Sequence, residues 1–274
     1  MFKFFKRRPE NNNSAYVPEG SAIKKVRRAR FFLFYGIVAI FFVFIAASWL
    51  IFRSPFFRIS DIKVVGNKSV PDNAVLSLAL SGVIRGNHLS ALLGTDHYFN
   101  WVENMLADRL FFFPELKSAE LDKNFRTGGV VITVEERKPR GIWCFRGGCW
   151  WFDEDGVVFG SALFAQGSLI DTVSDYSEND VALGRRVLRG DLIPGLFSVF
   201  GVLRNSGIAV KEIRLNDLEL EEVEVLTFNG PKIYFSLRFL SDGVLAVLKN
   251  LMSKSAFKEL DYVDFRVENR VYYK

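Results

Sequence analysis

The stretch FFLFYGIVAIFFVFIAASWLIF, from Phe31 to Phe52, contains no charged residue and is bounded by Arg30 and Arg53. At about 1.5 Å of rise per residue, roughly 22 residues form a helix of about 33 Å, enough to cross the hydrocarbon core of a bilayer. We therefore predict one transmembrane helix over 31–52. The alternative is a cleaved signal peptide, but the apolar region of such peptides is only about 7–15 residues long.

Residues 1–30 form a basic tail, which predicts the orientation of the helix. The tail contains nine Lys and Arg residues against two acidic ones. Positively charged flanks stay in the cytoplasm, so we expect a cytoplasmic N-terminus and an extracytoplasmic body. Without the tail, the chain has slightly more acidic than basic residues. The net charge of +5 therefore belongs to the tail and does not indicate nucleic-acid binding.

After the membrane helix, the pattern predicts a small α+β module over 56–138. Gly66-Asn67 predicts a turn because both residues tolerate positive φ. Pro71 is expected to begin a helix that Gly82 and Gly86-Asn87 break, and Pro114 is expected to end a second helix. The expected order is strand, helix, helix, strand and strand, at 58–65, from 71, and over 98–111, 116–121 and 129–135.

From Pro139 onward, short strands separated by Gly and Asp predict a β-rich domain over 139–274. The boundary between the two modules is expected near Lys138-Pro139-Arg140, because a proline disfavours helix in the residue before it. Strands are expected within 143–145, 149–152, 157–159, 212–215, 223–228, 232–237, 262–267 and 270–274, with helices near 193–204 and 241–252. The fold class is therefore α+β.

Cys144 and Cys149 bracket a predicted hairpin on the translocated side, where disulfides persist. If the loop is Arg146-Gly147, or all four intervening residues, the cysteines face each other with Cα atoms about 4.5–5.5 Å apart, within disulfide reach. A Gly147-Gly148 loop would shift the register and prevent the bond. We predict the disulfide. The alternative is two reduced, half-buried small side chains.

Four motifs follow the predicted helix in order: Ile62–Asn67 (IKVVGN), Val134–Pro139 (VEERKP), Phe152–Phe159 (FDEDGVVF) and Val263–Arg266 (VDFR). Together, behind a single crossing, they resemble the FtsQ/DivIB family of bacterial cell-division proteins. The resemblance covers nearly the whole chain except the tail and roughly residues 160–190. It implies a POTRA domain over 56–138, a β domain over 139–274, and a single-pass type II protein of the cell membrane at the division septum.

The resemblance further implies a non-enzymatic scaffold of the divisome that binds other bitopic division proteins, similar to FtsB and FtsL. Family members capture a partner strand near the C-terminus. The expected partner-binding residues are Arg266, Val267, Arg270, Val271, Tyr272 and Tyr273. An edge strand leaves backbone groups unpaired and can accept another strand. Val267 departs from the tyrosine that follows the arginine in the proteobacterial pattern. The alternative is an ordinary last strand shielded by its basic ends.

The sequence contains no convincing catalytic or metal-binding motif. Ser255-Ala256-Phe257-Lys258 fits the S-x-x-K motif of penicillin-binding proteins, but the companions S-D-N and K-T-G are missing. His88 and His97 lack H-E-x-x-H or C-x-x-C spacing. We therefore expect no enzyme activity, cofactor, metal or small-molecule substrate.

Two acidic motifs are expected to be structural. Glu135–Lys138 is expected to be a solvated strand end, and Asp153 and Asp155 are expected to form a turn. The alternative function is a POTRA-bearing, polypeptide-binding component of a transport system. Such proteins usually carry tandem modules and a barrel of many amphipathic strands, which this sequence lacks.

Overall fold

The computed structural model describes residues 19–86, 90–164, 170–177, 181–240 and 243–274, and it consists of two units, Met1–Phe57 and Arg58–Lys274. The first unit holds helix α1 (Glu19–Arg53) and the 3-10 helix η1 (Pro55–Phe57). Within α1, the segment Arg30–Leu50 is long and apolar enough to span a membrane, and none of it is buried inside the protein.

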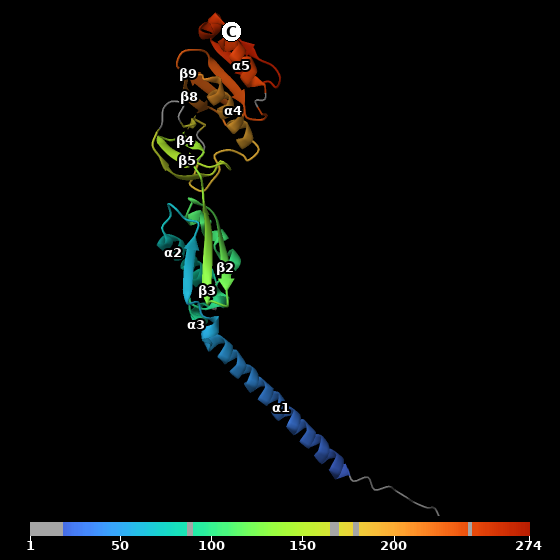
Figure 1. The fold of residues 1–274 in the computed structure, drawn as a ribbon. Coiled ribbons are helices and arrows are strands. Elements are labelled where there is room, and N and C mark those ends of the chain that lie inside the picture. The colour runs from blue at the N-terminus through green and yellow to red at the C-terminus, as the bar shows by residue number, and fades with distance from the viewer. Residues whose placement is uncertain (1–18, 87–89, 165–169, 178–180, 241–242) are drawn as a thin grey trace, which may run out of the picture. The chain divides into compact units, whose positions relative to one another are not determined.

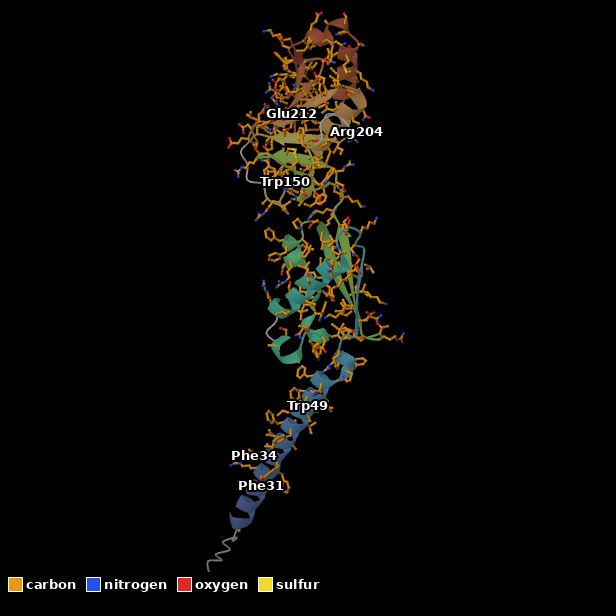
Figure 2. The ribbon with its side chains drawn as sticks, turned by 90° about the vertical axis from the view of Figure 1, so that its left-hand side faces the viewer. Phe31, Phe34, Trp49, Trp150, Arg204 and Glu212 are labelled. Atoms are coloured by element: carbon orange, nitrogen blue, oxygen red, sulfur yellow. A yellow bond between two sulfur atoms is a disulfide. The ribbon has the colours of Figure 1, made fainter. Side chains whose placement is uncertain are left out.

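Helix α1 begins earlier than the predicted 31–52, because it continues back through the basic residues 24–30 to Glu19. The apolar side chains of α1 project outward along the helix, as Figure 2 shows for Phe31, Phe34 and Trp49. These three side chains are 59%, 63% and 62% exposed. A helix with exposed apolar side chains along its length is typical of a membrane-spanning segment.

The second unit begins with a three-stranded sheet in the order β1-β3-β2 (Figure 1). Its strands are β1 (Asp61–Val65), β2 (Leu116–Asn124) and β3 (Gly129–Glu136), and they confirm the three strands predicted here. β1 runs parallel to β3, whereas β2 is antiparallel to it. Helix α2 (Asp72–Gly86) packs with one face of the sheet around a core that includes Val75, Leu78, Trp101, Leu106 and Ile132.

The prediction of a second continuous helix over 98–111 in this module is wrong. The chain forms a short helix α3 (Ser90–Leu93) and then three 3-10 helices: η2 (Tyr98–Asn100), η3 (Glu103–Met105) and η4 (Ala107–Phe112). Trp101 and Val102 have extended backbone between η2 and η3, which prevents a continuous helix. The Trp101 indole donates to the Thr95 carbonyl at 2.7 Å and holds this break in place.

The rest of the second unit contains a nine-stranded sheet in the order β12-β11-β10-β9-β8-β7-β4-β5-β6. Parallel pairs join β10 to β11, β4 to β7 and β7 to β8, and the other neighbours are antiparallel. The strands are β4 (Gly141–Phe145), β5 (Gly148–Phe152), β6 (Val158–Ala162), β7 (Thr172–Asp175), β8 (Val210–Leu215), β9 (Glu222–Thr227), β10 (Lys232–Ser236), β11 (Tyr262–Phe265) and β12 (Tyr272–Tyr273).

Helices α4 (Ile193–Ser206) and α5 (Val244–Met252), together with the 3-10 helix η5 (Ser255–Glu259), supply the apolar residues that cover one face of this sheet (Figure 1). The buried core lies between them and includes Trp143, Leu196, Ile213, Phe235 and Val263. It is separate from the core of the three-stranded sheet. The division of residues 56–274 into two independently folding modules at 138–139 stays a prediction.

Candidate partner-binding edge

Strand β12 lies at one end of the nine-stranded sheet and pairs only with β11 among the described strands. The predicted hairpin across Glu268-Asn269 is present: Asn269 has a φ of 58°, and the Arg270 amide donates to the Val267 carbonyl at 3.1 Å. Both strands are shorter than the predicted 262–267 and 270–274, because β11 ends at Phe265 and β12 contains two residues. Sequence patterning alone does not reveal that shortening.

The backbone directions of β12 follow from its register. Lys274 and Tyr262 exchange hydrogen bonds, with distances of 3.2 Å and 3.4 Å, so they form a hydrogen-bonded pair. Such pairs alternate with non-hydrogen-bonded pairs in an antiparallel ladder. Tyr272, opposite Asp264, therefore points its backbone groups toward β11, whereas Tyr273, opposite Val263, points its N–H and C=O to the open edge. The same alternation turns the Val271 backbone outward.

The side chains of this edge divide between the two faces of the sheet. Val271 is half-buried and packs against the main core. Tyr272 and Tyr273 are 48% and 52% exposed. The edge thus combines an anchored strand with exposed aromatic side chains and two outward-facing backbone positions.

A groove of about 400 Å³, lined by both apolar and polar residues, lies next to the turn that leads into β12. Its apolar lining includes Leu240, Val244 and Val247 from the α5 side, and Val267 and Val271 from the turn side, and the turn adds polar groups of residues 268–270. Leu240, Val247 and Val267 are each at least 40% exposed. An incoming strand that pairs with β12 would therefore find exposed apolar side chains, and polar groups between them, beside the unpaired backbone.

Arg266, an expected partner-binding residue, is held by its own domain. Its guanidinium donates to both Asp264 oxygens, at 2.9 Å and 2.6 Å, and to Glu222 at 3.0 Å. It also lies 4.8 Å from the centre of the Tyr234 ring. Hydrogen bonding to Asp264 is the main reason that the pKa of Arg266 is raised. These contacts, made just after the end of β11, hold Arg266 on the sheet face opposite the core.

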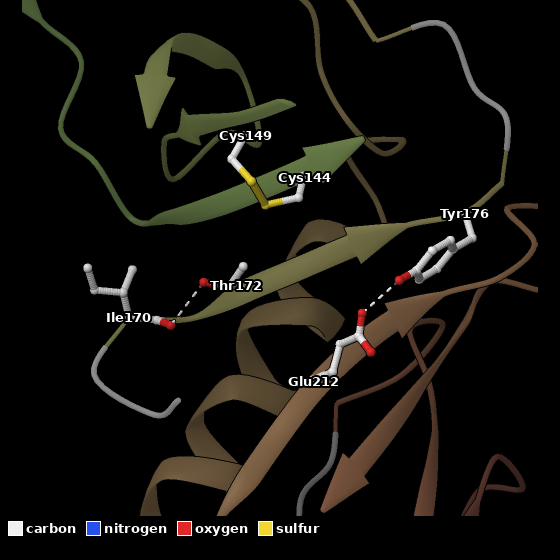
Figure 3. The surroundings of a disulfide bond; sticks show 6 residues. All are labelled: Cys144, Cys149, Ile170, Thr172, Tyr176 and Glu212. Carbon is white, nitrogen blue, oxygen red and sulfur yellow. Dashed lines mark hydrogen bonds between the residues drawn. A yellow bond between two sulfur atoms is a disulfide. The ribbon is translucent and has the colours of Figure 1, made fainter. Parts of the chain in front are cut away.

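The two cysteines are joined by a disulfide across the β4–β5 hairpin (Figure 3). Of the registers considered, the chain adopts the one with Arg146-Gly147 as the loop, so that Cys144 lies opposite Cys149. Both loop residues have positive φ, 48° and 78°, as a type I′ turn requires. The nearby hydroxyl of Tyr176 donates to Glu212 at 2.8 Å (Figure 3).

Glu136, expected to be solvated, instead closes the first module. One of its carboxylate oxygens accepts hydrogen bonds from the backbone amides of Lys68, Ser69 and Val70, at 2.7, 2.8 and 2.9 Å. Burial by itself raises the pKa of Glu136, but these amide donors outweigh it and hold the pKa below its ordinary value. The carboxylate thereby joins the end of β3 to the loop before α2.

The depressed pKa of Glu136 predicts a pH-dependent contribution to stability. Its stabilisation should be complete above the unfolded pKa of about 4.3 and should disappear as the pH falls through the lower folded pKa. We expect Glu136→Gln to lower the free energy of unfolding by about 1.5–3 kcal/mol at neutral pH, because three hydrogen bonds lose a charged acceptor.

Chemical denaturation of both proteins between pH 7 and pH 3 measures this difference. The matched control is Glu135→Gln, at the neighbouring exposed position, which should leave stability nearly unchanged. A Glu136→Gln difference that stays constant down to pH 3 would contradict the depressed pKa.

Two of the four sequence motifs contact each other through Arg137 and Asp153. The Arg137 guanidinium forms an ion pair with Asp153 Oδ2 and donates through Nε to the Pro114 carbonyl at 3.0 Å. Asp153 Oδ1 accepts from the Asp155 and Val157 amides at 3.0 and 2.8 Å. The turn predicted at Asp153 is therefore present, but its ion pair with Arg137 was not predicted.

The S-x-x-K residues Ser255 and Lys258 are exposed on η5, whose Phe257 packs into the core. His97 lies buried before η2, and His88 lies outside the described residues. In the described part of the chain, no group of three or more His, Cys, Asp or Glu side chains is arranged to hold a metal ion.

Comparison with known proteins leaves the chain without an identified family. A scan against protein-family models found no matching family. A search of the curated proteins likewise found no match.

Proposed function

We propose that this chain is a member of the FtsQ/DivIB family and acts as a non-enzymatic, membrane-anchored scaffold of the bacterial divisome. In this proposal α1 crosses the cell membrane once, with the N-terminus in the cytoplasm. The three-stranded module corresponds to a POTRA domain and the nine-stranded module to the β domain. The body then lies outside the cytoplasm, where the Cys144–Cys149 disulfide can persist.

The observation that best supports this function is the open edge at β12. Outward backbone groups at Val271 and Tyr273 lie beside a groove with exposed apolar side chains, and this combination suits the addition of a partner strand. We infer that an FtsB/FtsL-like bitopic protein supplies that strand. The backbone of β12 gives affinity, and the groove selects the side chains of the partner strand.

Proline substitution along β12 tests this binding mode. Tyr273→Pro removes an N–H that faces the open edge, so it should strongly reduce co-purification of the FtsB/FtsL-like protein from dividing cells. Tyr273→Ala is the matched control, because it removes the side chain but keeps the backbone donor. Tyr272→Pro should instead weaken the β11–β12 pairing, since its N–H faces Asp264.

Strand addition at this edge is wrong if Tyr273→Pro retains the partner as well as the unchanged protein does, while its circular dichroism and melting temperature stay the same. The wider proposal is tested by fluorescent tagging of the full chain in dividing cells. Septal bands are expected, and an even distribution around the cell membrane would instead favour the alternative polypeptide-transport function.

A further inference from the structure

We propose that one end of the three-stranded module, here called the tip, docks on the bilayer surface from which the chain emerges. The tip consists of the three segments Arg58–Ser60, Asp96–Phe99 and Asn124–Gly128. These segments are joined to each other: the Ile59 amide donates to the Asp96 carbonyl at 2.7 Å, and the Ser60 amide donates to Gly128 at 2.8 Å. The inference rests on the membrane anchoring proposed above.

The covalent chain keeps the tip near the membrane whatever orientation the module takes. Seven residue steps separate Arg53, the last residue of α1, from Ser60. At no more than about 3.6 Å per residue, Ser60 lies within about 25 Å of the helix end. The 3-10 turn Pro55–Phe57 shortens this reach further, because its rise is only about 2 Å per residue. The lipid surface is therefore always within the tip's range.

Two exposed aromatic side chains give the tip the composition of an interfacial anchor. Phe99 is 45% exposed and Phe125 is 47% exposed. The Phe125 ring covers the buried Tyr98 ring on one side, with 4.8 Å between their centres, and is accessible on the other. Partly exposed aromatic rings favour the headgroup level of a bilayer, where an apolar surface can leave water without entering the hydrocarbon core.

Basic side chains beside these rings match the phosphate groups of lipids. Arg126 is exposed next to Phe125. The Arg58 side chain is 51% exposed, and its guanidinium lies 3.8 Å from Asp96, the acidic residue of the tip. Two arginines against one aspartate leave a positive tip, which anionic headgroups attract.

The loop that carries Phe125 is held rigidly before any contact with lipid. The Tyr98 hydroxyl lies 3.1 Å from the Asn124 carbonyl and 3.0 Å from the Gly129 carbonyl, at the two ends of the loop. The Asn124 side chain accepts hydrogen bonds from the Arg126 and Thr127 amides, at 3.1 and 3.3 Å. A preorganised loop loses little conformational entropy on docking, so two rings and two arginines can suffice.

Spin labelling of the full chain in liposomes of phosphatidylcholine and phosphatidylglycerol tests the inference. Because Cys144 and Cys149 are joined, one introduced cysteine takes the label selectively. Thr127→Cys reports on the tip, Asn229→Cys in the exposed β9–β10 turn serves as the reference in water, and Ile40→Cys reports on the membrane span. We expect the label at 127 to collide severalfold less with a water-soluble nickel complex than the label at 229.

Phe125→Ser in the Thr127→Cys protein should return the label to the exposure seen at 229. The matched control is Phe228→Ser, which removes an equally exposed ring, 52% accessible, outside the tip and should change nothing. A label at 127 as exposed as that at 229, with the label at 40 inside the bilayer, would overturn the docking alone. A water-exposed label at 40 would overturn the anchoring and this inference with it.

Discussion

Replacement of Arg137 by methionine is expected to lower the free energy of unfolding by about 3–5 kcal/mol, because it leaves a buried carboxylate without its partner. The side chain of Asp153 is only 2% exposed, and that of Arg137 is 15% exposed. Methionine retains much of the arginine's apolar stem, so the loss reports mainly on the charge and its hydrogen bonds. Urea denaturation followed by tryptophan fluorescence measures it.

A double-mutant cycle makes this result specific to the pair. Asp153→Ala alone should also destabilise strongly, since the Asp155 and Val157 amides lose their acceptor along with Arg137. The double variant should lose clearly less free energy of unfolding than the sum of the losses of the two single variants. Lys117→Ala is the control, because it breaks the nearby but exposed contact to Glu154 and should have little effect. Additive losses of Arg137 and Asp153 would show that the pair is not coupled.

Gly66→Ala is expected to destabilise the three-stranded module by about 3 kcal/mol or more, since a strained φ and a backbone clash add together. Gly66 has a φ of +94°, and an added Cβ would lie 2.1 Å from the Val134 carbonyl oxygen in β3. Backbone at this position cannot yield without disturbing the β1–β3 pairing. Thermal unfolding followed by circular dichroism measures the loss.

Gly147→Ala supplies the matched control for this prediction. Gly147 also has positive φ, +78°, but no atom lies within 4 Å of the position that its Cβ would take. Gly147→Ala should therefore lower the free energy of unfolding by only about 1–2 kcal/mol, which is the strain of an alanine in the left-handed backbone region. Equal losses at the two glycines would mean that the contact with Val134 has no effect.

The turn at Gly66-Asn67 was predicted from residue propensities, and the structure shows which interactions form it. The turn was predicted correctly, but the reason was correct for only one residue. Gly66 has positive φ, whereas Asn67 acts through its side chain, which donates to the Val70 carbonyl at 2.8 Å and to Asp72 at 2.6 Å. Local propensity identifies a turn, but several different hydrogen-bond arrangements can produce it.

Strand β7 was not predicted, although it lies between β8 and β4 within the large sheet. Its four residues, Thr172–Asp175, lack a clear apolar alternation, and aspartate is disfavoured in strands. Asp175 is nevertheless buried, because its carboxylate accepts a hydrogen bond from the Trp143 indole at 3.0 Å. Such a pairing depends on residues 32 positions apart, so a local pattern cannot indicate it.

The helix predicted after Pro71 is present in the first module as α2, but one of its two predicted breaks is not. Gly82 and Gly86-Asn87 were both expected to break this helix. It ends at Gly86 but runs through Gly82, where the Arg109 side chain lies 3.4 Å from the position of an added Cβ. Where strands alternate clearly, as in β2 and β3, the prediction was confirmed. The open edge at β12 was likewise predictable as a hairpin, but the outward direction of the Tyr273 backbone required the register.

In the scaffold function proposed above, the chain is held at both ends, and the parallel pairing of β1 with β3 then has a mechanical consequence. Tension between a membrane anchor and a captured partner enters this module at the start of β1 and leaves it at the end of β3. In a parallel pair these are opposite ends, so the pull shears the five residue pairs from Asp61–Gly129 to Val65–Thr133 simultaneously. The two-residue strand β12 can form far fewer backbone hydrogen bonds with a partner than the β1–β3 ladder contains. Under load, the joint to the partner should therefore release before the module unfolds.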